Sequence, residues 1–250
     1  GHALEPEAVS PVATLLGGTG QLVLAGDPCQ LGPVVHSEVS RAAGFGISFL
    51  ERLVMSPLYA GGAYAWSQAA QPVTSVESCA DDLVIPQQVN GHSPLVLTKL
   101  TRNFRAHDAL LALPNRLFYG GELECCGDKL VTDSLLGWDV LPVPTLPLLF
   151  HGIAGRDQRE AISPSWFNAD EAAVVVDYVE QLLGWRKSRV STSQIGVITA
   201  FNKQVHKISK LLRRRGHIGE NSGVKVGPVE SFQGQERKAI IISTLRASHE

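Results

Sequence analysis

The most informative absence in this sequence is a phosphate-binding loop. No Gly-Lys-Ser or Gly-Lys-Thr occurs among its 250 residues, so no lysine is present in the setting that binds β- and γ-phosphates. The one Asp-Glu pair, Asp170-Glu171, does not follow an apolar strand and is excluded as a magnesium-holding motif. The start of a helix explains the Asp170-Glu171 pair better than a magnesium site does, because Asn168 as N-cap and Glu171 three residues later predict a capping box.

Other shortages exclude further classes of protein. The four cysteines show neither zinc spacing nor a disulfide framework, which fits a reducing, intracellular compartment. The histidines show no ligand spacing, so the sequence supports no metal site. No apolar stretch reaches transmembrane length and no signal peptide is visible. Without a Gly-x-Gly-x-x-Gly fingerprint, a metabolic nucleotide enzyme is a weak alternative.

Positive charge is scarce in the first part of the chain. The net charge of −2 argues against a general nucleic-acid binder. Residues 1–94 hold two arginines and eight acidic residues, a net −6, whereas residues 95–250 hold 20 basic and 16 acidic residues, a net +4. The C-terminal part is therefore the part able to face phosphate, with a solvated surface as the alternative.

Strands and helices alternate along the chain, which predicts an α/β fold with a parallel sheet and right-handed crossovers. Residues 1–35 indicate a helix and a short strand at 21–25, and residues 45–54 have helical spacing. The next segment, residues 56–94, has no Lys or Arg and little periodicity, which indicates a flexible insertion. The later pattern predicts strands at 95–100, 146–150 and 195–199 and helices at 107–119, 168–183 and 201–214.

The last two helices have clear apolar faces. We expect these inward residues: Ala172, Val175, Val176, Val179 and Leu183 in the first, and Phe201, Val205, Ile208, Leu211 and Leu212 in the second. A basic stripe lies on the other face of the second helix: Lys203, Lys207, Lys210 and Arg214. Such a stripe can follow RNA phosphates, but solvation of an amphipathic helix is the favoured interpretation.

Three polar segments adjoin predicted strands. The segment Val229–Glu236 precedes the β-branched run Ala239–Ser243, which predicts a glycine turn before a buried parallel strand. Gly26–Val34 follows the strand at 21–25 and contains Gln30, whose amide both donates and accepts hydrogen bonds. Arg105 follows an aromatic residue, and its planar guanidinium suits phosphate. Plain turns and a structural ion pair are the alternatives.

In this order the segments resemble the motifs of superfamily 1 RNA helicases of the up-frameshift type. Gly26–Leu31 is similar to motif III, Asn103–His107 to motif IV and Val229–Glu236 to motif V. Four further blocks resemble the Armitage and Moloney-leukaemia-virus-10-like subgroup: Pro114–Leu123, Phe150–Gly152, Ser163–Asn168 and Gln204–Ile208. The chain departs from the family at Phe104, where a tyrosine is usual, and at Ala200-Phe201, where Pro-Tyr is usual.

The resemblance implies a RecA-like P-loop NTPase fold. Residues 1–55 would end a first RecA-like domain and include motif III, residues 56–94 would be the insertion, and residues 95–250 would form a second domain, incomplete at its C-terminus. The resemblance also implies roles for single residues. Gln30 would sense the γ-phosphate and Arg105 would act as an arginine finger, so both are predicted to be catalytic. Predicted ATP contacts are Asp27, Gln30, Phe104, Arg105, Gly234 and Glu236, and predicted RNA contacts are Thr199, Ser231 and Gln233.

By the same resemblance, the chain is expected to be a fragment of an ATP-dependent 5′-to-3′ RNA helicase that acts in small-RNA silencing, including PIWI-interacting RNA. Its cofactor would be ATP with Mg²⁺, whose metal ligands this sequence lacks, and the isolated chain would be inactive. Single-stranded RNA and Argonaute or PIWI-class proteins are the expected partners, without a membrane, in the cytoplasm and its RNP granules. The alternative is a truncated, non-catalytic RNA-binding or interaction product.

Overall fold

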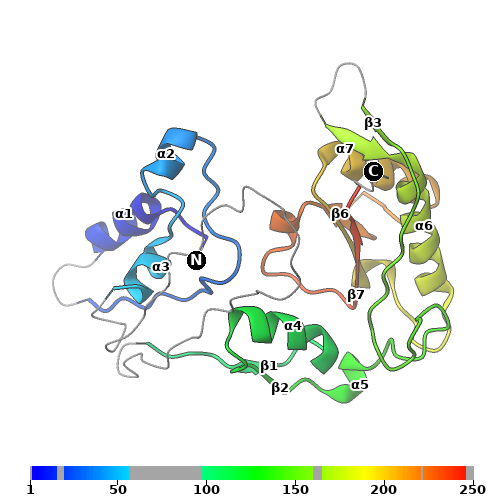
Figure 1. The fold of residues 1–250 in the computed structure, drawn as a ribbon, viewed down its shortest axis with the longest axis horizontal. Helices are drawn as coiled ribbons and strands as arrows, with labels where there is room; N and C mark the ends of the chain where they lie inside the picture. Colours follow the sequence, from blue (N-terminus) through cyan, green and yellow to red (C-terminus); the bar gives the residue numbers. More distant parts are fainter. Residues whose placement is uncertain (1, 16–19, 57–96, 160–164, 221, 246–250) are drawn as a thin grey trace, which may run out of the picture. The chain divides into compact units, whose positions relative to one another are not determined.

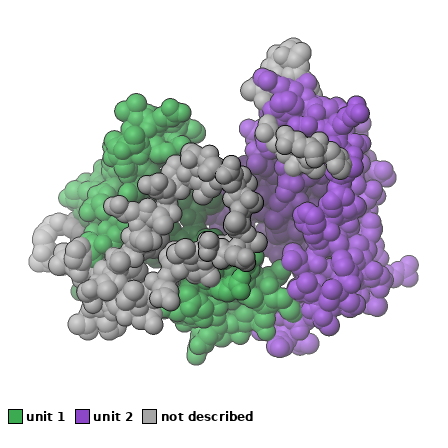
Figure 2. All heavy atoms as spheres, viewed as in Figure 1, with its two compact units in different colours: residues 1–126 green, residues 127–250 purple. Residues whose placement is uncertain are grey.

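The chain forms two compact units, residues 1–126 and residues 127–250, each described by itself below (Figure 2). The computed structural model describes residues 2–15, 20–56, 97–159, 165–220 and 222–245. All but Ser56 of the expected insertion therefore lies outside the described residues. The domain assignment drawn from the resemblance stays a prediction. Among the described residues, no helix has both the length and the apolar character needed to cross a membrane.

Unit 1 consists of short helices and one small parallel ladder (Figure 1). Its elements are α1 Glu5–Leu15, α2 Glu38–Ala42, α3 Phe49–Val54, β1 Arg102–Asn103, α4 Asp108–Phe118 and β2 Glu124–Cys125. The helices expected within residues 1–35 and at 107–119 are confirmed. The helix expected at 45–54 begins only at Phe49, because Ser48 is its N-cap. β1 pairs in parallel with β2, through Arg102 with Glu124 and Asn103 with Cys125.

Two strands predicted in unit 1 are wrong. Residues 21–25 and 97–100 have no strand conformation, and Val23 and Leu100 are 88% and 89% exposed. Residues 95 and 96 lie outside the described part. A strand is stabilised by neighbours that share its hydrogen bonds. Neither stretch has such a neighbour among the described residues, so apolar composition alone does not produce a ladder.

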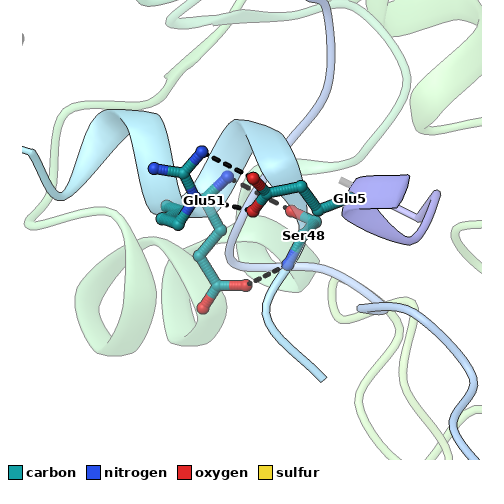
Figure 3. A network of polar contacts seen from close by, with 4 residues as sticks. Glu5, Ser48 and Glu51 are labelled. Atoms are coloured by element: carbon teal, nitrogen blue, oxygen red, sulfur yellow. Dashed lines mark hydrogen bonds and ion pairs between the residues drawn. The ribbon is translucent and has the colours of Figure 1, made fainter. Parts of the chain in front are cut away.

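An ion pair joins α1 to α3, and a capping box closes the first turn of α3 (Figure 3). Arg52 donates from Nε and Nη2 to the two carboxylate oxygens of Glu5, both at 2.6 Å. Ser48 Oγ accepts from the Glu51 backbone N–H at 3.2 Å, and Glu51 Oε2 accepts from the Ser48 N–H at 3.4 Å. The hydrogen bond from Arg52 also holds the pKa of Glu5 below its ordinary value.

Unit 2 is built on a three-stranded parallel sheet in the order β6-β5-β7 (Figure 1). Its strands are β5 Ile195–Thr199, β6 Lys225–Gly227 and β7 Ala239–Ser243, and the helices α6 Ala169–Gly184 and α7 Asn202–Arg214 pack on it. The shorter elements are α5 Lys129–Thr132, β3 Asp157–Arg159, β4 Trp166–Asn168, η1 Thr192–Gln194 and η2 Val229–Phe232. The predicted strand at 195–199 and both predicted helices are confirmed.

The strand expected at 146–150 is wrong. These residues have no strand conformation, and Phe150 is 89% exposed. Pro147 lies inside the run and has no N–H to give to a ladder, which explains the outcome. The β7 strand is parallel as expected, but it is buried on one face only, since Ile240 and Ile242 are 43% and 67% exposed.

The helix faces differ from the prediction in detail. On α6, Leu182 completes the buried face instead of Leu183. The other four expected residues are buried: Ala172, Val175, Val176 and Val179. On α7, Ile208 and Leu212 are fully buried, while Phe201, Val205 and Leu211 are partly exposed. The polar Gln204 takes the remaining buried position of α7. In the basic stripe, Lys207 Nζ lies 4.2 Å from the centroid of the Phe167 ring, and Lys210 and Arg214 are exposed.

Gln204 joins three elements of unit 2 through its buried amide. Its Oε1 accepts from the Asn168 N–H at 3.0 Å, and its Nε2 donates to Asn168 O at 3.2 Å and to Ser243 Oγ at 3.1 Å. This arrangement corrects the predicted capping box. Asn168 caps α6 by accepting from the Glu171 N–H at 3.0 Å, but the Glu171 carboxylate accepts from the Leu245 N–H instead.

We expect Gln204→Leu to destabilise unit 2 by ~1–3 kcal/mol, because the buried Asn168 N–H loses its acceptor. Urea unfolding followed by tryptophan fluorescence measures the change, since Trp138, Trp166 and Trp185 all lie in unit 2. The matched control is Gln181→Leu, on the exposed face of α6, with an expected change within about 0.5 kcal/mol. Equal unfolding midpoints for the two variants would contradict the bridging role of Gln204.

Candidate functional site

The loop that contains Gln30 is organised around the Asp27 carboxylate. Asp27 Oδ1 accepts from the Cys29 N–H at 2.9 Å, which closes a short Asx turn. Asp27 Oδ2 accepts from Gln30 Nε2 at 2.6 Å and from the Tyr119 hydroxyl at 2.7 Å. An ionised carboxylate only accepts hydrogen bonds, so Asp27 sets which end of the Gln30 amide faces it.

Tyr119 and Cys29 attach this loop to the end of α4. Cys29 Sγ donates to the Phe118 carbonyl at 3.5 Å, beside the bond from Tyr119 to Asp27. Burial raises the pKa of Tyr119 well above its ordinary value, and the Asp27 hydrogen bond and charge raise it further. Burial, then the charge of Asp27, raises the pKa of the Cys29 thiol. No role for Tyr119 follows from sequence spacing, because it lies 92 residues from Asp27.

Asn103 holds the turn that presents Phe104 and Arg105. Its Oδ1 accepts from the Arg105 N–H at 3.0 Å and from the Ala106 N–H at 2.8 Å. His107 then caps α4, its Nδ1 accepting from the Ala109 N–H at 3.1 Å. Phe104 is 67% exposed and Arg105 is exposed as well. An exposed aromatic ring beside a guanidinium suits a planar, anionic ligand.

The turn at 229–236 in unit 2 is formed by η2 and the residues after it. Ser231 Oγ donates to the Pro228 carbonyl at 2.7 Å, so its hydroxyl is engaged within the turn. Lys225 Nζ donates to the Ser231 carbonyl and lies 5.0 Å from the centroid of the Phe232 ring. Gly234 follows with a φ of +70°, a conformation that costs other L-residues energy.

Phe232 anchors this turn on the sheet. A Cβ atom at Gly196 of β5 would lie 2.6 Å from Phe232 Cε1 and 2.8 Å from Ile240 Cδ1. The Phe232 ring therefore packs directly on the β5 backbone at Gly196, where any side chain would occupy the same space. Gln233, Gly234 and Glu236 remain exposed, and Arg237 Nη1 donates to the Glu236 carbonyl at 2.7 Å. The turn thus presents exposed polar groups from a fixed base.

Thr199 has a different setting from the other predicted RNA contacts. It ends β5, pairs with Ser243 of β7 and is only 1% exposed. Its Oγ1 is buried and has no hydrogen-bond partner among the described residues.

The predicted residues form three local groups. Asp27 and Gln30 are hydrogen-bonded in unit 1, and Phe104 and Arg105 share one turn of the same unit. Ser231, Gln233, Gly234 and Glu236 share the turn of unit 2, with Thr199 at the end of β5. Their catalytic and binding roles stay predictions. Across the described ranges, no group of three or more His, Cys, Asp or Glu residues is arranged to hold a metal ion.

The AAA domain family matches residues 86–250. The chain belongs to this family. It is 46% identical over 250 residues to a human protein named RNA helicase Mov10l1, an alignment that covers 100% of this chain and 19% of the relative. It is 36% identical over 260 residues to the probable RNA helicase armi of Drosophila melanogaster, covering 100% of this chain and 20% of the relative.

A third relative extends the comparison to the up-frameshift type. The regulator of nonsense transcripts 1 homolog of Arabidopsis thaliana is 32% identical over 250 residues, covering 99% of this chain and 16% of the relative. The chain is thus a member of the superfamily 1, up-frameshift-type helicases, in the Armitage and Mov10-like subgroup, as its motifs predict. The predicted α/β, RecA-like fold class is confirmed too. The chain spans about a fifth of the length of the first two relatives.

We expect Gly234→Ala to strain the turn by ~1 kcal/mol through its positive φ alone, since a Cβ there meets no atom within 4 Å. Amide hydrogen exchange of residues 229–236 should become faster. Gly184→Ala is the matched control, because its Cβ also meets no atom within 4 Å and its φ is not in the left-handed region. Exchange at 229–236 that is equally fast in both variants would rule out a conformational requirement for glycine at position 234.

Proposed function

We propose that this chain is part of an ATP-dependent, 5′-to-3′ RNA helicase or RNP remodeller. The observation that carries the proposal is the similarity, over essentially the whole chain, to proteins named RNA helicases. The local geometry supports it. Each unit presents exposed polar groups from a hydrogen-bonded turn, which is what phosphate and nucleic-acid contacts require.

In this proposal Gln30 and Arg105 act on the γ-phosphate of ATP. Arg105 stabilises the charge that develops on the transferred phosphoryl group, as a guanidinium does with two parallel donors. Gln30, oriented by Asp27, senses the phosphate or holds the attacking water. Phe104 stacks near the adenine, and Gly234 and Glu236 are two further proposed ATP contacts.

The RNA side of the proposal uses the turn of unit 2. Gln233 is exposed and offers an amide, whereas the Ser231 hydroxyl already donates within the turn and can act toward RNA only as an acceptor. A contact from Thr199 requires the end of β5 to open, because that side chain is buried. Mg²⁺ would arrive with ATP, and its protein ligands would come from outside this sequence.

We also propose a biological setting from the subgroup. The protein would act in small-RNA silencing, including PIWI-interacting RNA, with single-stranded RNA and Argonaute or PIWI-class proteins as partners. Its place would be the cytoplasm, including RNP granules. Co-purification of an Argonaute or PIWI-class protein that survives ribonuclease treatment would support a direct partnership.

A second candidate function is a non-catalytic RNA-binding or interaction product. It is favoured by one observation, the lack of any Gly-Lys-Ser or Gly-Lys-Thr in the sequence. The two candidates differ in ATP hydrolysis, which the 250-residue chain by itself is expected not to perform.

We expect the full-length protein to hydrolyse ATP faster when single-stranded RNA is added. Arg105→Ala should lower kcat by about 10³-fold, because the transition state loses its guanidinium. Steady-state phosphate release measures the effect. Arg186→Ala, at an exposed position of unit 2 outside every predicted motif, is the matched control and should keep the rate of the unmodified protein.

Two results would contradict this assignment. RNA-independent or absent hydrolysis by the full-length protein would favour the non-catalytic candidate. Equal rates for Arg105→Ala and Arg186→Ala would remove Arg105 from the catalytic residues while leaving the helicase assignment in place.

A further inference from the structure

We propose that Tyr119 is a positioning residue that orients Gln30 through the Asp27 carboxylate and couples the motif III loop to α4. The proposal rests on the function proposed above for Gln30. Tyr119 itself would touch neither ATP nor RNA. Its hydroxyl lies 2.7 Å from Asp27 Oδ2, the same oxygen that accepts from Gln30 Nε2 at 2.6 Å.

The shared acceptor, Asp27 Oδ2, determines the orientation of the Gln30 amide. An amide side chain can turn by 180° about its last bond and exchange donor for acceptor. A carboxylate prevents this exchange at Gln30, because it accepts hydrogen bonds only. The Gln30 Nε2 therefore faces Asp27, and the carbonyl Oε1 is directed away from it, where it can accept a hydrogen bond from a ligand. The Gln30 side chain is also hydrogen-bonded to the Tyr119 side chain, so Asp27 and Tyr119 act on the same amide.

The Asp27 carboxylate is itself held in place by hydrogen bonds to both of its oxygens. A lone carboxylate on a loop can rotate and carry the Gln30 amide with it. Here the Cys29 N–H holds Oδ1 at 2.9 Å, and the Tyr119 hydroxyl holds Oδ2. The two donors belong to separate segments, since Cys29 lies in the same loop as Asp27 and Tyr119 lies at the end of α4. Both carboxylate oxygens are therefore positioned before Gln30 is considered.

Helix α4 connects the loop that contains Gln30 to the turn that contains Arg105. Tyr119 is the C-cap of α4, and Asn103 and His107 hold the turn that leads into the same helix. Cys29 Sγ adds a second contact by donating to the Phe118 carbonyl. The loop with Gln30 is thus attached to one end of α4, while Arg105 lies just before the other end. A helix is a stiff connector, so a displacement of α4 reaches both predicted catalytic side chains.

Cys29 provides a readout that does not depend on catalysis. Its thiol is partly buried against the loop and α4. If Tyr119 holds the loop on α4, Tyr119→Phe should expose this thiol. Alkylation by iodoacetamide, in which the thiolate displaces iodide, reports on that exposure. The measurement uses the chain with Cys79, Cys125 and Cys126 replaced by serine, so that Cys29 is the remaining thiol.

We expect Tyr119→Phe to speed Cys29 alkylation about fivefold, the order of one lost hydrogen bond. Tyr178→Phe is the matched control, because it also removes a hydroxyl that makes a 2.7 Å bond, to His151 Nδ1 in unit 2. It should leave the rate unchanged. Thermal unfolding of each variant identifies any that does not fold. Should Tyr119→Phe not fold, Asp27→Ala replaces it and should speed the same reaction.

In the full-length protein, Tyr119→Phe should lower kcat of RNA-stimulated ATP hydrolysis about tenfold with KM for ATP within about twofold, as expected when a group acts mainly in the transition state. Added to Asp27→Ala, it should have a much smaller effect than it has alone, because Tyr119 and Asp27 act on the same Gln30 amide. If Tyr119 had only a structural role, the losses in kcat caused by Tyr119→Phe and by Asp27→Ala would be additive, as free energies, in the double variant.

The outcomes separate the two proposals. Unchanged Cys29 alkylation, unchanged kcat, or additive effects of the two substitutions would each overturn the role of Tyr119 and leave the helicase assignment standing. If the unmodified full-length protein hydrolyses no ATP, the proposed function fails instead, and Cys29 alkylation alone decides whether Tyr119 holds the loop. Faster alkylation together with a lower kcat supports both.

Discussion

The irregular stretch at residues 21–35 of unit 1 depends on the hydrogen bonds that converge on the Asp27 carboxylate. Three donors reach its two oxygens, from the Cys29 backbone, the Gln30 amide and the Tyr119 hydroxyl. Without them, residues 21–35 would have few fixed contacts, since this stretch forms no helix or strand. The Asp27 carboxylate thus supplies hydrogen bonds that stabilise this irregular loop, as the hydrogen bonds of a sheet stabilise a strand. It also gives a candidate catalytic amide a defined orientation.

Unit 2 is organised by a comparable polar group in an apolar setting. Gln204 is fully buried among residues such as Ile208 and Leu212, where an unpaired amide would be costly. It is paired on both ends, to the backbone of Asn168 and to Ser243. The N-cap of α6, the helix α7 and the end of β7 are consequently held in one arrangement. The predicted RNA contact Thr199 lies at the neighbouring strand end, paired with Ser243.

The helices that sequence patterns predicted correctly share one property, a strong local signal. Helices α4, α6 and α7 have apolar faces of helical period, and α6 also has Asn168 as N-cap. The strands predicted wrongly were short apolar runs, at 21–25, 95–100 and 146–150. Such runs specify only that a stretch is apolar. Whether it becomes a strand depends on a neighbour with free hydrogen-bonding groups, and Pro147 further removes a donor from the last of them.

The sequence by itself determined the family, the α/β class and the candidate site residues, because motifs and periodicity are properties of consecutive residues. Only the tertiary structure decided which of those residues meet. It placed Tyr119 on Asp27 across 92 positions, buried Thr199, gave Glu171 to Leu245 instead of a capping box and put Phe232 over Gly196. Each of these contacts joins residues that no local pattern connects. Long-range hydrogen bonds and close packing form only when the tertiary fold brings distant segments of the chain together.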